Sequence, residues 1–319
     1  MGVRIGVARR PRGLMVLCAA LATVLLASTA SAAPRLPSPG TSAQIAKLVA
    51  ASVNIQTLTP TVSVKVAKAY NDNSAIDYPQ TRNFCTALSA CVFGDKKSSK
   101  KLVIMGDSHA QMWIPALNRI GIARKLKVIV LYMARCPAAT LDVWLATFDS
   151  SYTACSRQRT AWLAEINQLH PVTVLLADYT VGVYSAASNG SQLFTSAEWQ
   201  AGMETTITDL APSNAKLAVL GDSVTFNIAP PLCLADYPNV QMCDTPNPNP
   251  AKPGQQAAER AAASAASVLY VDPTKWLCTS TACSPVVGNF IVYYDAFHLS
   301  CTYAAFLSGV LQAALNKVL

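Results

Sequence analysis

The chain has 319 residues, 52% hydrophobic and 13% charged, with 25 basic and 17 acidic side chains and a net charge of +8. Four of the basic residues are arginines before position 13, so the chain beyond Ala32 carries 21 basic against 17 acidic residues, a net charge of +4. Much of that excess is a lysine cluster within 96–101 without interleaved aromatic residues, which argues against a nucleic-acid partner and is typical of a solvated loop.

The first 32 residues have the pattern of a secretory signal peptide. Four arginines precede an apolar run at 14–27, and Ala30, Ser31 and Ala32 form an A-x-A cleavage site. The run is shorter than the span of about 20 residues that a transmembrane helix needs. No later stretch is apolar enough to cross a bilayer, so we expect an extracytoplasmic chain with no membrane span after cleavage.

The rest of the chain divides into an extension and a large domain. Residues 33–99 begin rich in Ala, Pro, Ser and Thr, with a short helix expected at 44–52, and they precede the catalytic domain of residues 100–319. From there short apolar runs alternate with helical periodicity. The expected strands are 102–105, 128–133, 172–177, 216–220 and 268–271, and the expected helices are 110–126, 155–169, 196–210, 253–267 and 302–318.

This alternation predicts an α/β fold with a parallel sheet covered by helices on both faces. The segments 141–155 and 226–250 are expected to be loops inserted between these elements. Ligands of such sheets bind beyond the carboxyl ends of the strands, so the residues that follow each strand are the candidates for function.

Nine cysteines follow the leader, and outside the cytoplasm such a set is first interpreted as disulfides. Neighbours in the sequence suggest the pairs Cys85–Cys91, Cys136–Cys155, Cys233–Cys243 and Cys278–Cys283, with Cys301 left over. Spacing alone does not prove this connectivity. With three scattered histidines and no CxxC pair, we expect neither a metal site nor a cofactor.

A candidate nucleophile follows the first strand. In Gly106-Asp107-Ser108-His109, Ser108 lies at the turn into a helix, where its hydroxyl is exposed and its own N–H can stabilise an oxyanion. Gly106 permits the tight turn. A serine that only caps the helix is the simpler explanation of this triplet on its own.

A serine nucleophile needs a base, and the chain has three histidines. His109 is adjacent to Ser108 and poorly placed to take its proton, whereas His170 lies at a helix end, where capping is typical. His298 remains, and Asp295 stands three residues before it, on the same face of a turn. Asp295 can then orient the imidazole, and we predict the triad Ser108, His298 and Asp295.

A second GDS triplet, at 221–223, follows the fourth strand and competes for the role of nucleophile. No histidine follows it, and Pro230 and Pro231 come soon after. We therefore expect it to line the cleft or to form a turn.

Gly106 to His109 and Asp295 to His298 resemble the first and last motif blocks of the SGNH (GDSL-type) hydrolase superfamily. The resemblance is greatest to SGNH domains fused to acyltransferase-3 type membrane proteins, which O-acylate envelope glycans. It rests on residues 91–95, 106–113, 115–117, 136–137, 231–235 and 297–300, and it covers the chain roughly from Ile45 to the C-terminus. It implies a three-layer α/β/α, flavodoxin-like fold and a Ser-His-Asp mechanism.

The chain departs from the superfamily at the oxyanion hole, which usually takes a Gly from the second block and an Asn from the third. Where the Asn of the third block is expected, this chain has Asp178 and Tyr179. An ionised carboxylate accepts hydrogen bonds and does not donate them, whereas a tyrosine hydroxyl donates. We expect Asp107, Asp178 and Tyr179 to line the site weakly, with slow turnover or a partner that completes the site.

These observations predict an exported serine esterase or O-acyltransferase acting on O-acyl, most simply O-acetyl, groups of a cell-envelope carbohydrate, with a glycan or small acyl ester as substrate. The same residues serve both reactions, and transfer requires an acyl donor, for example one supplied by a membrane acyltransferase. Two alternatives stay open. One is a non-catalytic carbohydrate-binding or acceptor-presenting domain, and the other is a lipase or thioesterase that uses the same triad.

Overall fold

The computed structural model describes residues 36–248 and 254–319, and residues 36–319 form one compact unit. The predicted signal peptide, residues 1–32, lies outside the described residues. Within the described residues, no helix combines the length and the hydrophobicity that a membrane crossing requires.

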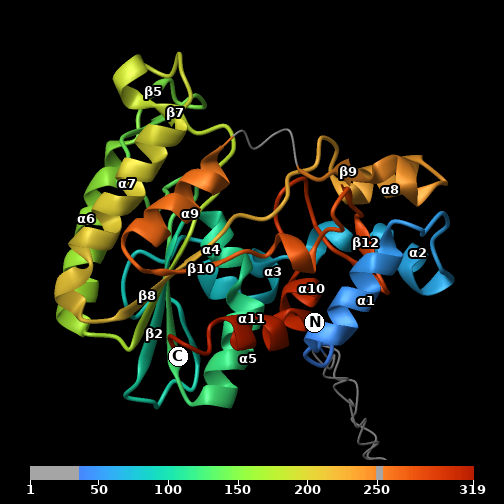
Figure 1. Ribbon diagram of the computed structural model, residues 1–319, viewed down its shortest axis with the longest axis horizontal. Helices are drawn as coiled ribbons and strands as arrows, with labels where there is room; N and C mark the ends of the chain where they lie inside the picture. The colour runs from blue at the N-terminus through green and yellow to red at the C-terminus, as the bar shows by residue number, and fades with distance from the viewer. Residues whose placement is uncertain (1–35, 249–253) are drawn as a thin grey trace, which may run out of the picture. The chain divides into compact units, whose positions relative to one another are not determined.

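A six-stranded sheet forms the centre of the domain (Figure 1). In spatial order its strands are β1 (Val92–Gly94), β3 (Lys127–Tyr132), β2 (Lys101–Gly106), β6 (Thr173–Ala177), β8 (Lys216–Leu220) and β10 (Leu269–Val271). The strands from β3 to β10 are parallel, as predicted, whereas β1 runs antiparallel to β3 at one edge. The sheet is therefore mixed, because a strand of the extension that the sequence did not reveal pairs with it.

Helices cover both faces of this sheet. Alternate residues of β2 point to opposite sides, so Leu102 and Ile104 pack in one core, with α5 (Ile114–Arg124), α10 (Cys301–Phe306) and α11 (Ser308–Ala314). The other core contains residues of α6 (Thr153–Leu169), α7 (Ser196–Asp209) and α9 (Gln255–Ala265). The arrangement is the predicted three-layer α/β/α architecture.

Two predicted helices are broken in the structure. The segment expected as one helix at 110–126 consists of α4 (Ser108–Met112) and α5, separated at Trp113, and Pro115 stands in the first turn of α5. Proline has no N–H for the preceding turn, so a new helix begins there. The predicted helix at 302–318 is likewise divided into α10 and α11 at Leu307.

The extension forms regular structure in its described part, residues 36–99. It contains α1 (Ser42–Ser52), α2 (Pro60–Val66) and α3 (Ser74–Asp77), of which α1 confirms the helix expected at 44–52. Thr41 caps α1 by accepting a hydrogen bond from the Gln44 N–H at 3.2 Å. Ile45 and Val49 of α1 are buried in the same core as Phe306. The boundary at residue 100 therefore marks no break in packing.

Both predicted loops contain short regular elements. In the first, β4 (Val143–Leu145) pairs with β5 (Ser150–Ser151) and β7 (Tyr184–Ser185). The second contains α8 (Pro230–Asp236) and β9 (Thr245–Pro246), which pairs with β11 (Ala282–Cys283). The remaining strands of the described residues, β12 (Val286–Val287) and β13 (Phe290–Ile291), form a hairpin. The 3-10 helices are Ala69–Asn71, Pro79–Thr81, Ala186–Ser188, Ala211–Ser213, Val240–Cys243 and Thr274–Trp276.

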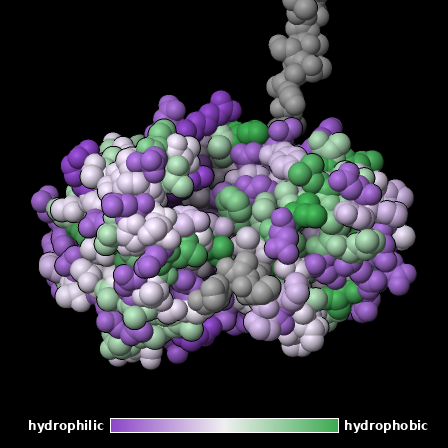
Figure 2. Space-filling view, turned by 90° about the horizontal axis from the view of Figure 1, so that it is seen from above, coloured by the Kyte–Doolittle hydropathy of each residue, from purple (hydrophilic) through white to green (hydrophobic). Residues whose placement is uncertain are grey.

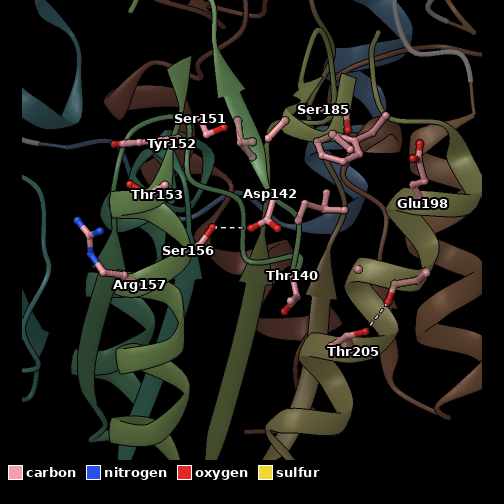
Figure 3. A pocket seen from close by; sticks show the side chains of 17 residues that line it. Thr140, Asp142, Ser151, Tyr152, Thr153, Ser156, Arg157, Ser185, Glu198 and Thr205 are labelled. Atoms are coloured by element: carbon pink, nitrogen blue, oxygen red, sulfur yellow. Dashed lines mark hydrogen bonds between the residues drawn. The ribbon is translucent and has the colours of Figure 1, made fainter. Parts of the chain in front are cut away.

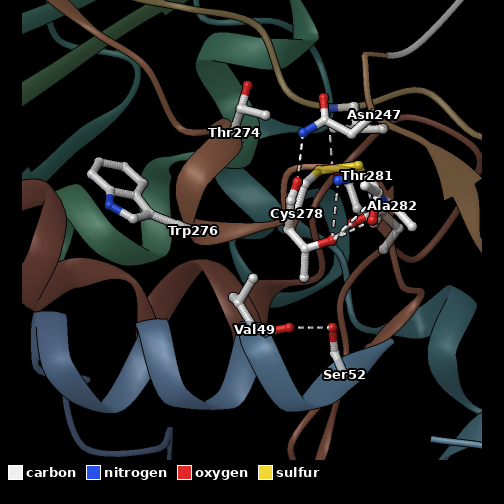
Figure 4. The surroundings of a disulfide bond; sticks show 12 residues. Val49, Ser52, Asn247, Thr274, Trp276, Cys278, Thr281 and Ala282 are labelled. Atoms are coloured by element: carbon white, nitrogen blue, oxygen red, sulfur yellow. Dashed lines mark hydrogen bonds between the residues drawn. A yellow bond between two sulfur atoms is a disulfide. The ribbon is translucent and has the colours of Figure 1, made fainter. Parts of the chain in front are cut away.

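Four disulfides join the cysteines in the pairs suggested by their spacing: Cys85–Cys91, Cys136–Cys155, Cys233–Cys243 and Cys278–Cys283. Cys301 is free and buried. Near Cys278–Cys283, the side chain and backbone N–H groups of Asn247 donate to the carbonyls of Thr279 and Thr281 at 2.6 and 2.9 Å (Figure 4). The disulfide closes the turn after β10, and these hydrogen bonds attach the second insertion to that turn.

Candidate active site

The nucleophile turn is built by the end of β2. Gly106 approaches β6 so closely that a Cβ there would lie 1.9 Å from the Ala177 carbonyl oxygen, so only glycine fits. Asp107 caps α4 by accepting a hydrogen bond from the His109 N–H at 2.8 Å. Ser108 is the first residue of α4 and is half-buried. The predicted nucleophile therefore stands at the carboxyl edge of the sheet.

Asp295 and His298 are in direct contact. The Asp295 Oδ2 atom lies 2.7 Å from His298 Nδ1, and Oδ1 accepts hydrogen bonds from the N–H groups of Phe297 and His298 at 2.9 and 2.7 Å. Burial opposes ionisation, but the hydrogen bonds and charge of His298 and the backbone N–H groups together lower the pKa of Asp295 below its ordinary value. An ionised Asp295 accepts a hydrogen bond from the Nδ1–H group, so in the neutral imidazole the lone pair lies on Nε2.

The ring of His298 lies next to the nucleophile turn. Its Nε2 atom is buried and, within the part of the chain that the structure describes, has no hydrogen-bond partner. The ring lies 5.0 Å from the ring of His109, the residue after Ser108, and stacks on Tyr294 at 5.3 Å. Figure 2, which looks onto this edge of the domain, shows a hollow in the surface. The two predicted motifs therefore converge at one place.

Buried aspartates tie together the loops that follow the strands. Asp107, after β2, accepts a hydrogen bond from the Tyr179 N–H at 2.9 Å. Asp178, after β6, accepts from the N–H groups of Ala138 and Ala139 at 2.6 and 3.1 Å. Burial raises the pKa of Asp178 to about 7, against the lowering effect of these hydrogen bonds. Burial, with the charge of Asp178, also raises the pKa of Asp107 well above its ordinary value.

These contacts define the roles of the weaker candidates. Both oxygens of Asp178 face loop amides, so this side chain supports the loop after β3. The ring of Tyr179 lies 4.7 Å from the ring of His109 and 5.0 Å from that of Phe297, so it packs against the residue after Ser108 and the residue before His298. Burial, with the charge of Asp222, raises the pKa of the Tyr179 hydroxyl to about 12, so this hydroxyl stays protonated at neutral pH.

Two site residues were not predicted in their observed role. His109 is buried, and its Nδ1 lies 2.6 Å from Oδ1 of Asp222, a residue in the loop after β8. The neighbouring Ser223 is also buried and donates a hydrogen bond to the Phe297 carbonyl at 3.1 Å, so it is occupied structurally. The sequence signal was the repeated GDS triplet, which places polar residues after two strands of one sheet.

Other features of the molecule lie apart from this site. His170 ends α6, as expected of a capping residue, with Nδ1 at 3.0 Å from the Ser213 carbonyl. A cavity of about 780 Å³ lies beside α6, α7 and β4 (Figure 3). Its described lining includes none of Ser108, Asp295 and His298, so the chemistry is not placed there.

Several solved structures are similar to this chain, and one of them, a periplasmic domain, supports its fold. The periplasmic domain of a lipopolysaccharide acetyltransferase from Salmonella ser. Paratyphi A superposes with a TM-score of 0.57 at 16% identity, covering 80% of this chain and 98% of that one. An inhibitor-bound aryl esterase from M. smegmatis has a TM-score of 0.44 at 12% identity and covers 69% and 100%. A putative acylhydrolase from Bacteroides fragilis has a TM-score of 0.42 at 14% identity and covers 76% and 97%.

No curated protein matches the chain by sequence. The family model of the SGNH domain, described as fused to AT3 domains, matches residues 76–313. This match covers most of the chain, including both motif blocks and the sheet that carries them. The chain therefore belongs to the family of SGNH domains that occur fused to AT3 domains.

Proposed function

We propose that this protein is an extracytoplasmic serine esterase or O-acyltransferase that acts on O-acyl, most simply O-acetyl, groups of a cell-envelope carbohydrate. The observation that carries the proposal is the Asp295–His298 pair beside the Ser108 turn. Asp295 holds Nδ1 at 2.7 Å, and Nε2 has no partner among the described residues. A serine nucleophile needs an imidazole oriented in this way.

The reaction follows from this arrangement. Ser108 Oγ attacks the acyl carbonyl carbon while His298 Nε2 takes the hydroxyl proton. The tetrahedral intermediate collapses, the bond from the acyl carbon to the leaving group breaks, and His298 returns the proton to that leaving group, which is the sugar oxygen in an esterase and the donor's own group in a transferase. The acyl group is then an ester of Ser108. His298 next activates a second nucleophile, which is water in an esterase and an acceptor hydroxyl in a transferase.

The oxyanion is stabilised by fewer donors than in the superfamily pattern. The Ser108 backbone N–H supplies one donor, whereas the oxygens of Asp178 face Ala138 and Ala139. Each missing donor costs about 3 kcal/mol of transition-state stabilisation, so we expect slow turnover of simple esters.

The substrate and setting are inferred from chemistry and from the family. Four disulfides favour an oxidising compartment outside the cytoplasm. The family is named for fusion to AT3 domains, and the neighbour with a TM-score of 0.57 is the periplasmic domain of a lipopolysaccharide acetyltransferase. A membrane acyltransferase is therefore the partner we propose as acyl donor, with an envelope glycan as acceptor.

A non-catalytic, acceptor-presenting domain is the second candidate. It is favoured by the orientation of Asp178, because the third block supplies no amide donor at its expected place. This candidate predicts glycan binding without turnover, unaffected by removal of the Ser108 hydroxyl.

Two measurements on the oxidised chain beginning at Ala33 decide between these functions. The first is acetate release from p-nitrophenyl acetate and from an acetylated oligosaccharide, which we expect to fall about 10⁴-fold or more in Ser108→Ala and His298→Ala. The second is the final extent of covalent labelling by a fluorophosphonate, which Ser108→Ala should abolish and which Ser223→Ala should leave complete even if labelling is slower. Equal turnover in the wild type, Ser108→Ala and His298→Ala would eliminate the Ser108 mechanism.

A further inference from the structure

The active site contains a second imidazole–carboxylate pair that the mechanism does not use. His109 Nδ1 lies 2.6 Å from Asp222 Oδ1, and the exposed fractions of the two side chains are 1% and 0%. A charged carboxylate is costly to bury unless it is paired and hydrogen-bonded, and Asp222 is both. Its Oδ2 atom accepts hydrogen bonds from the N–H and the hydroxyl of Thr180 at 2.9 and 3.0 Å. Asp222 thus joins the loops after β2, β6 and β8.

The Asp222 loop is also bound to the loop that carries His298. Ser223 Oγ donates to the Phe297 carbonyl at 3.1 Å, and the Phe226 N–H donates to the Ala296 carbonyl at 2.7 Å. The Val224 N–H donates to the Tyr293 hydroxyl at 3.1 Å. The six residues from Tyr293 to His298 are therefore held at three points by the segment directly after Asp222.

His109 completes the connection on the nucleophile side. It follows Ser108 in the chain, and its ring lies 5.0 Å from His298 and 6.0 Å from Phe297. The backbone of His109 is fixed separately, by its N–H bond to Asp107. A movement of the His109 ring would shift both the Ser108 turn and the surface on which His298 rests.

We propose that His109 and Asp222 are positioning residues, which hold the Ser108 turn and the His298 loop in the relative geometry that proton transfer requires. The repeated GDS triplet thereby has two distinct roles: Ser108 of the first is the nucleophile, and Asp222 and Ser223 of the second link the two halves of the triad. This inference rests on the proposed function, since it assigns a role within the same reaction.

The expected effect is on the chemical step. Misplacement of reacting groups by about 1 Å costs about 100-fold in rate. Asp222→Asn keeps the shape of the side chain but removes its charge, and we expect kcat for p-nitrophenyl acetate to fall about 100-fold with KM changed less than about threefold. Asp272→Asn is the matched control, because Asp272 follows the neighbouring strand β10 and pairs with Arg260 at 2.7 Å on the surface. It should retain wild-type kcat.

A spectroscopic readout tests positioning without relying on activity. The chain has three histidines, so the ring N–H protons of ¹⁵N-histidine-labelled protein are few enough to assign. We expect two hydrogen-bonded Nδ1 protons facing carboxylates, from His109 and His298. Asp222→Asn should remove or shift the Nδ1–H signal of His109 and also displace the Nδ1–H signal of His298, while the ring N–H signal of His170 stays unchanged.

The outcomes separate the two proposals. Loss of kcat with an unchanged melting midpoint and a displaced His298 signal supports positioning. Wild-type kcat and an unmoved His298 signal in folded Asp222→Asn overturn it. If the wild type hydrolyses no ester but the His298 signal still moves, the proposed activity fails and the positioning role stands. If Asp222→Asn does not melt cooperatively, Ser223→Ala decides: a fall in kcat of about tenfold supports the link, and unchanged kcat refutes it.

Discussion

Replacing Asp295 by asparagine tests the triad at the point where the structure constrains it most. One oxygen, Oδ1, accepts two backbone hydrogen bonds, from Phe297 and His298 at 2.9 and 2.7 Å. An asparagine at this position must therefore keep its carbonyl oxygen toward these N–H groups. Its amide nitrogen then points to His298 Nδ1, where the carboxylate oxygen lies at 2.7 Å in the native protein.

The consequence is a reversal of one hydrogen bond. The amide donates to Nδ1, so the imidazole proton moves to Nε2 and the lone pair that should accept the Ser108 proton is lost. A wrong tautomer of this kind lowers kcat by about 10⁴-fold in a serine triad, which corresponds to about 5 kcal/mol of transition-state stabilisation. The fold is largely preserved, because both backbone hydrogen bonds to residue 295 remain.

The assay is p-nitrophenyl acetate hydrolysis by wild type and Asp295→Asn, with thermal melting of both. Asp272→Asn serves as the control for loss of one carboxylate charge, since Asp272 also accepts a backbone N–H, from Thr274 at 2.9 Å, but lies in the surface pair with Arg260. A folded Asp295→Asn that keeps kcat within about tenfold of wild type would refute the assignment of Asp295 as the residue that orients His298.

Three further predictions concern stability and reactivity. Burial raises the folded-state pKa of Asp178 to about 7, above its unfolded value, so the folded state holds a proton that the unfolded state has lost, and the free energy of unfolding should fall as pH rises from about 4 to about 7. The urea midpoints at pH 5 and pH 7.5 should therefore differ less in Asp178→Asn than in the wild type. An equal difference in the two proteins would contradict this prediction. The Cys136–Cys155 disulfide closes the longest loop of the four disulfides, 19 residues. Replacing both cysteines by serine should therefore lower the free energy of unfolding, measured by urea titration, by about 3 kcal/mol. A loss below about 1 kcal/mol would show that this disulfide contributes little to stability. Burial raises the pKa of the Cys301 thiol, and the residue is 1% exposed. Ellman's reagent should therefore label the folded chain that begins at Ala33 far more slowly than the urea-unfolded chain. Equal labelling rates would show that this cysteine is accessible in the folded chain.

Features that depend on neighbours in the sequence were predictable from the sequence. The Asp295–His298 pair spans three residues, and each disulfide joins the nearest cysteines, 5 to 19 residues apart. Continuous apolar runs identified the five parallel strands, since strands buried on both faces carry little else. These patterns are local, so no knowledge of the tertiary structure is needed to find them.

Where the sequence interpretation missed strands of the structure, distant segments decided the outcome. The edge strand β1 forms because residues 92–94 meet β3, more than 30 residues later in the chain, and the short strand β9 forms because it meets β11. Such short pairings leave no periodicity in the sequence, because two or three residues do not complete a pattern.

The sequence by itself identified the candidate residues of the proposed triad, a serine at a strand end and a histidine with its aspartate three residues before, and the order of strands and helices that brings them to one edge. Only the tertiary structure decided how that edge is held together. The sequence did not reveal the partners of Asp107, Asp178 and Asp222, and each of these side chains bonds to a loop about 40 or more residues away. The partners of a buried carboxylate are chosen by the fold, because burial requires that its hydrogen bonds be satisfied but leaves open which segment satisfies them.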